Sequence, residues 1–265
     1  MASHAERRQA ARVAREAKFR ESARAQRLRL VGLGAVVALA AVVGVVLALT
    51  SSSGSTSTPA ASVAAVARVG ALLDGIPQSG TTLGNASAPV SITEFGDLVC
   101  PVCAAFASGS ESALIRADVR SGRVKLVFRG LDTASSTANQ SQYTNTQVAV
   151  RAAGLQNAGW YYILLAYAEQ PQTINGALAE TMPYVTTAYL QRIAAQIHGL
   201  NLIRWQAGLT NQNLMNAVTA DAQAATAAHV TGTPAIFVSG PKGTVASPNP
   251  VPSLTDLDAL IQQVG

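Results

Sequence analysis

Cysteine and histidine are scarce in this chain of 265 residues. It has two cysteines, Cys100 and Cys103, and three histidines. Two cysteines so close together exclude a disulfide framework. They also exclude a structural zinc site, because such a site takes four ligands at paired spacings and His198 and His229 do not form a second pair. We therefore expect neither a metal nor another cofactor.

Charge is also scarce, and its positive excess is confined to one end. Residues 1–30 contain nine Lys or Arg and three Glu, a net charge of +6, whereas the whole chain carries +5. The remaining 235 residues therefore carry −1 and have no cationic surplus for binding phosphates. This distribution predicts that nucleic acid is not a partner.

A long apolar run follows the basic segment. Residues 31–49 contain no charged side chain, and the run is long enough to cross the ~30 Å core of a membrane as a helix. We expect a cytoplasmic tail at 1–30, a single-pass anchor at 31–50, and a linker with a short helix at 51–75, with the C-terminal part outside the cytoplasm. A cleavable signal peptide is the alternative, but its apolar region is usually only ~7–15 residues long.

The spacing of the two cysteines predicts redox chemistry. A bridge across two residues closes almost no loop, so it stabilises the fold very little. At the start of a helix, however, the first sulfur lies near unpaired N–H groups and the positive end of the helix dipole, which favour the thiolate. The thiolate is the nucleophile in disulfide exchange.

The residues before the pair predict a buried strand. With a period of two, Val90, Ile92 and Glu94 share one face, which places a carboxyl group on the apolar side. Glu94 is either solvated at the strand end or buried beneath the cysteines, where it would have a raised pKa and relay a proton. Asp97 is interpreted as a turn or cap residue.

The residues after the pair predict a helix and then a second strand. Pro101 suits the first helical turn. The chain 124–129 has an apolar pattern typical of a strand and would close a βαβ unit. The helix would have one buried face, formed by Cys103, Phe106, Ala107, Ser110, Leu114 and Ala117.

A second motif lies far downstream, where Thr233-Pro234 leads directly into the apolar run Ala235-Ile236-Phe237-Val238. Together with Glu94 and the Cys-Pro-Val-Cys motif at 100–103, it resembles the thioredoxin superfamily, and more narrowly the DsbA-like and BdbD-like disulfide oxidoreductases. The resemblance covers residues 76–265. It implies an α/β thioredoxin-like fold with an inserted helical subdomain at about 136–228, here preceded by one transmembrane helix.

The resemblance also implies roles for the site residues. Cys100 would be the exposed attacking sulfur and Cys103 the buried resolving one, with Thr233 and Pro234 forming a cis-proline loop that faces the bridge and binds substrate backbone. Pro101 and Val102, between the cysteines, would tune the redox potential. Strongly oxidising relatives have histidine at the position of Val102, so we expect the pKa of Cys100 to lie nearer the ~7 of thioredoxin than the ~3.5 of DsbA.

The segment 136–228 is expected to be helical and to lack strands. Periodicity predicts helices at 143–156, 159–169, 184–197 and 212–228. The aromatic and apolar side chains spaced along them are expected to form its core: Trp160, Tyr161, Leu164, Tyr167 and Trp205.

These patterns lead to a functional hypothesis. The chain is expected to be an extracytoplasmic thiol:disulfide oxidoreductase that oxidises unfolded or reduced exported proteins. The resemblance implies reoxidation by a quinone-linked membrane enzyme of the DsbB or vitamin-K-epoxide-reductase type. A reductase or isomerase uses the same residues, and a non-catalytic thioredoxin-like binding module is an alternative of a different class.

Overall fold

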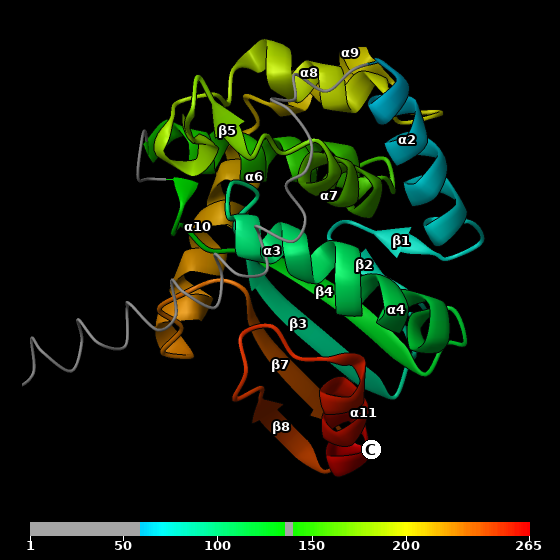
Figure 1. Cartoon of the computed structure of the whole chain (residues 1–265). Helices are drawn as coiled ribbons and strands as arrows, with labels where there is room; N and C mark the ends of the chain where they lie inside the picture. Colours follow the sequence, from blue (N-terminus) through cyan, green and yellow to red (C-terminus); the bar gives the residue numbers. More distant parts are fainter. Residues whose placement is uncertain (1–58, 136–139) are drawn as a thin grey trace, which may run out of the picture. The chain divides into compact units, whose positions relative to one another are not determined.

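The computed structural model describes residues 59–135 and 140–265 (Figure 1). The described residues all belong to one compact unit. The predicted basic tail at 1–30, the anchor at 31–50 and the first part of the linker lie outside the described residues. Across the two described stretches, no helix has both the length and the apolarity to cross a membrane.

A six-stranded mixed sheet forms the centre of the unit, in the order β1-β2-β4-β3-β7-β8. Parallel strands β3 and β4 lie in its middle, and β7 runs antiparallel to β3. The predicted βαβ unit and the α/β class are confirmed. The strands span Gln78–Ser79 (β1), Thr82–Leu83 (β2), Val90–Gly96 (β3), Val124–Gly130 (β4), Ala235–Gly240 (β7) and Gly243–Ala246 (β8).

Helices cover both faces of this sheet (Figure 1). The helix that follows the cysteines packs against the C-terminal helix α11 (Leu254–Val264), which also contacts β7. Helix α10 (Gln212–Ala227) contacts β4. The helix α2 (Pro59–Leu73) includes the short helix expected before the domain. It packs on α7 (Gly159–Ala168) and η2 (Ile115–Val119).

The helix after the cysteines departs from the predicted periodicity. Two π-turns interrupt it, and Gly109 within the first has non-helical angles of φ −97° and ψ −107°. A π-turn closes its hydrogen bond one residue later than an α-turn, so later side chains rotate to new positions. The segments are α3 (Pro101–Phe106), η1 (Ala107–Glu111), α4 (Ser112–Leu114) and η2 (Ile115–Val119).

The expected buried face is therefore wrong at Ser110 and Ala117, whereas Leu114 is buried as predicted. Ser110 is only partly buried and Ala117 is exposed, whereas Glu111 and Asp118 are buried at 1% and 2% exposure. The inward face has moved by one residue at both positions. As a consequence, a carboxyl group enters the interior where the α-helical period had placed a serine.

The chain between β4 and β7 is largely helical, and it differs from the expectation in two respects. The segment contains a small two-stranded sheet, although it was expected to lack strands, and a fifth helix, α9, that the periodicity missed. Helix α9 has seven residues, too few for a clear periodic pattern, and its start is capped by Asn201. The remaining elements are α6 (Gln140–Gly154), α7 (Gly159–Ala168), β5 (Thr173–Ile174), β6 (Ala177–Leu178), η3 (Ala179–Thr181), α8 (Thr187–Ala195) and α9 (Leu202–Gly208).

Aromatic side chains form the core of the insertion, as expected. Trp160 and Trp205 are fully buried, whereas Tyr161 is only partly buried. The indole N–H of Trp160 donates to the backbone oxygen of Thr81 at 2.9 Å, and that of Trp205 donates to the backbone oxygen of Ala149 at 3.0 Å. The bond to Thr81 fixes α7 to the turn between β1 and β2, so the insertion and the sheet share one core.

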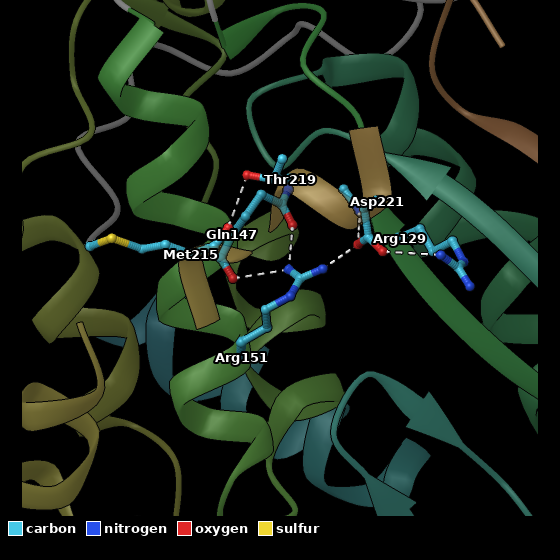
Figure 2. A network of polar contacts seen from close by, with 7 residues as sticks. Arg129, Gln147, Arg151, Met215, Thr219 and Asp221 are labelled. Carbon is cyan, nitrogen blue, oxygen red and sulfur yellow. Dashed lines mark hydrogen bonds and ion pairs between the residues drawn. The ribbon is translucent and has the colours of Figure 1, made fainter. Parts of the chain in front are cut away.

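A buried ionic network joins the insertion to the end of β4 (Figure 2). Asp221 of α10 pairs with Arg151 of α6 and with Arg129 of β4, and it accepts a hydrogen bond of 2.9 Å from the backbone N–H of Gly130. Arg151 also donates to the side-chain oxygen of Gln147. The network holds two helices of the insertion against the residue from which the loop 131–135 starts, and that loop reaches the candidate site.

Candidate active site

The two cysteines lie where the sequence predicts, at the start of the helix that follows β3. Cys100 is the N-cap residue of α3, Pro101 occupies the first turn, and Cys103 lies one turn inside. Both thiols are free. Cys103 is fully buried, and Cys100 is 7% exposed. The expectation of an exposed Cys100 is thus wrong in degree, because the loop containing Thr233 covers its sulfur.

The electrostatic environment separates the two thiols. Hydrogen bonds lower the pKa of Cys100 to about 7, against the effect of burial. The largest contribution comes from the Cys103 side chain, and the Thr233 side chain and the backbone N–H groups of Cys103 and Val102 add to it. Burial raises the pKa of Cys103 well above its ordinary value. Cys100 is therefore the sulfur that ionises near neutral pH, which is the requirement for a nucleophile.

The Thr233–Pro234 loop lies against Cys100. The peptide bond between these two residues is cis, as the resemblance implies. Strand β7 starts at the next residue and pairs with β3, with Ala235 opposite Phe95, and this pairing brings the loop to the end of β3. The Cys100 thiol donates to the backbone oxygen of Thr233 at 3.6 Å. The structure thus brings together two motifs that are 130 residues apart.

Asp97 connects the loops of the site, which makes it more than the turn or cap residue expected. It is fully buried and accepts hydrogen bonds from the backbone N–H groups of Val99, Thr133 and Ser135, at 2.9, 3.0 and 2.8 Å. The hydroxyls of Thr133 and Ser135 also donate to it. Thr133 in turn lies 2.6 Å from the hydroxyl of Thr233. Asp97 therefore holds the cysteine loop and the loop 131–135 together, and through Thr133 it reaches the proline loop.

Glu94 is buried, so the alternative of a solvated side chain is wrong. It is 2% exposed, and burial raises its pKa well above the ordinary value, with the nearby Glu111 adding to the shift. Gly96 makes room for it. A Cβ atom at that position would lie 3.0 Å from Glu94 Oε1 and 2.8 Å from the hydroxyl of Tyr167.

Glu111 is a candidate site residue that the sequence did not reveal. It belongs to the first π-turn, is 1% exposed, and lies close to Glu94. Burial raises its pKa to about 7, although the nearby Glu94 carboxyl group opposes the shift. The one available signal was Gly109, which breaks the helical period two residues earlier.

The chain belongs to the thioredoxin family. The family model described as thioredoxin matches residues 78–256, which include both cysteines, Glu94 and the Thr233–Pro234 loop. No curated protein matches the sequence.

Solved structures of similar fold include three proteins of low sequence identity. Oxidised BdbD from Bacillus subtilis is 19% identical, with a TM-score of 0.58, over 71% of this chain and 95% of that one. α-DsbA1 from Wolbachia pipientis is 16% identical, with a TM-score of 0.53, over 72% of this chain and 92% of that one. MdbA from Corynebacterium diphtheriae, a thiol-disulfide oxidoreductase, is 16% identical, with a TM-score of 0.52, over 71% of this chain and 92% of that one. At these identities, the similarity concerns the fold.

Proposed function

We propose that this protein is a thiol:disulfide oxidoreductase that acts outside the cytoplasm on exported proteins. The observation that carries the proposal is the asymmetry of the cysteine pair. Cys100 has a pKa lowered to about 7 and lies against the Thr233–Pro234 loop, whereas Cys103 is buried behind it. Only the first sulfur is then available for exchange with a substrate.

In the oxidising direction, a substrate thiolate attacks the sulfur of Cys100 in the Cys100–Cys103 disulfide. The bond between the two cysteines breaks, Cys103 leaves with the electron pair, and a mixed disulfide joins Cys100 to the substrate. A second substrate thiolate attacks the substrate sulfur of the mixed disulfide. This step releases an oxidised substrate and leaves both cysteines reduced. A quinone-linked membrane oxidant of the DsbB or vitamin-K-epoxide-reductase type would then accept the two electrons and restore the bridge.

The reverse direction is the second candidate, and a specific observation favours it. The pKa of Cys100, about 7, is near the value typical of thioredoxin, a reductant, and well above the ~3.5 of DsbA. Reductase or isomerase activity would use the same two sulfurs.

Equilibration of the pair with glutathione buffers distinguishes the two directions. A potential near about −120 mV indicates an oxidant and one near about −270 mV a reductant. Cys100→Ser is the control, because it removes the attacking sulfur. A wild-type bridge that forms but does not exchange with reduced substrate would contradict the enzyme proposal and favour a binding module.

The location is proposed from the sequence of residues 1–50. The basic tail followed by an uncharged run supports an anchor whose C-terminal side faces away from the cytoplasm. In intact spheroplasts, external protease should remove the domain and leave residues 1–30 protected. A mature soluble form that starts near Ser51 would contradict the anchor.

A further inference from the structure

Two buried acids, Glu94 and Glu111, lie close to each other, and Glu94 lies close to the cysteine pair. Glu94 comes from the end of β3 and Glu111 from the first π-turn. Within the described residues, their oxygens have no partner at standard hydrogen-bond geometry, and no ion pair is formed with either. The two carboxyl groups are nevertheless close enough for a shared proton to link them. Two unpaired carboxylates in an apolar interior would be very costly, whereas a pair that retains a proton is not.

Tyr167 and Cys103 complete the same cluster. The Tyr167 hydroxyl from α7 is buried and has no hydrogen-bond partner in the described part of the chain. The charges of Cys103, Glu94 and Glu111 all act on it, and the charges of Glu94 and Cys100 act on Cys103. Among the described residues, the titratable groups of this cluster come from β3, η1, α3 and α7, and none of them is a cation.

We propose that Glu94 and Glu111 together form one proton store for Cys103, in which Glu111 acts as a positioning residue through Glu94. The proposal rests on the proposed exchange function. It requires the first π-turn, because an uninterrupted α-helix would place Ser110 on the inward face.

The store acts when the bridge opens. Cys103 leaves the disulfide as a thiolate and takes one proton from the doubly protonated pair. The pair then retains one proton and carries one negative charge, which both carboxyl groups share. The buried charge remains one throughout, and it moves from a single sulfur to two carboxyl groups. Because the pKa of Glu111 is about 7, the pair changes between two protons and one at the pH where exchange would operate.

Carboxyl titration of the full-length protein tests the pair directly. With ¹³C-labelled glutamate, the infrared C=O band should show two linked steps in the reduced wild type, one near pH 7. In Glu111→Gln, a single titration step should remain, that of the buried Glu94, and its pKa should lie below the upper pKa of the wild-type pair. Titration of both buried acids near their ordinary pKa of 4.5 would overturn the proposal without any variant.

The rate of disulfide opening against pH tests the link to Cys103. Glu94→Gln should slow opening about 100-fold at pH 7, and Glu111→Gln about tenfold with loss of the inflection near pH 7. The double variant should be no slower than Glu94→Gln alone, because the two acids act as a unit. Asp118→Asn is the matched control, since Asp118 is a buried acid on the same helix that pairs with Arg123, and its pH profile should be that of the wild type.

The outcomes separate this proposal from the proposed function. An active wild type whose rate profile is unchanged by Glu111→Gln would overturn the proton store alone. Rate losses that multiply in the double variant would do the same. A wild type that does not exchange disulfides at any pH would overturn the oxidoreductase proposal, and the store for Cys103 with it.

Discussion

Replacing Asp97 with asparagine should destabilise the domain and alter Cys100 at the same time. The carboxyl oxygens of Asp97 accept three backbone N–H groups and two hydroxyls. An asparagine side chain directs its NH₂ group at one or more of these N–H donors, whichever way the amide is turned. The loss of one or two hydrogen bonds to a charged group, at about 1.5–3 kcal/mol each, predicts a cost of about 1.5–6 kcal/mol.

Urea denaturation measures this cost. For a domain of this size, with a slope near 2–3 kcal/mol per molar urea, the midpoint should fall by about 0.5–3 M. The pH dependence of alkylation should also show the pKa of Cys100 rising above about 7, because Thr133 no longer holds Thr233 against the sulfur. Asp258→Asn is the control, since that acid forms an exposed pair with Arg123 and should cost under about 1 kcal/mol. Wild-type stability and an unchanged Cys100 pKa in Asp97→Asn would refute the reasoning.

Three further predictions concern the buried sulfur, the cysteine motif and pH. In the reduced protein, iodoacetamide should modify Cys100 before Cys103, and equal rates by mass spectrometry would remove the directional mechanism. Val102→His should lower the pKa of Cys100 and raise the reduction potential measured against glutathione, since an imidazolium stabilises the thiolate; an unchanged potential would contradict this. Burial raises the folded-state pKa of Glu111 from 4.5 to about 7, so the folded protein binds this proton more tightly than the unfolded chain does. As the pH rises from about 4.5 to 7, the wild type should therefore lose stability relative to Glu111→Gln. Urea midpoints of the two proteins that change in parallel over this range would contradict the pKa shift.

The elements nearest the cysteines could be predicted from the sequence because their patterns are local. The alternation from Val90 to Glu94 predicts a strand and a buried acid, and the run after Pro234 predicts the strand that pairs with it. Strands β1 and β2 have two residues each, too few to alternate visibly, and they exist because the sheet provides partners. Two partners of Asp97, Thr133 and Ser135, lie 36 and 38 residues away in a loop, where no periodic pattern points to them.

Glu111 could not be predicted for a different reason. Helical periodicity assumes that every turn has the same number of residues, and one π-turn breaks that assumption for all later positions. The shift places an acid rather than a serine behind Cys103, which is unfavourable for folding unless the acid keeps a proton. A buried acid without an ionic partner is more often found at a functional site than in a purely structural core. The irregular turn is therefore better explained by chemistry than by packing.

The same reasoning applies to the redox poise of the pair. Val102 provides no side-chain donor, so the groups that stabilise the Cys100 thiolate are Cys103, two backbone N–H groups and Thr233. Thr233 is held by Thr133, which is held by Asp97. Most of these groups belong to the cysteine motif itself, and Thr233 adds a contribution from a loop that meets the motif only in the folded protein. Its reduction potential should therefore depend on the position of the loop 131–135, which the network of Arg151 and Asp221 fixes at the end of β4.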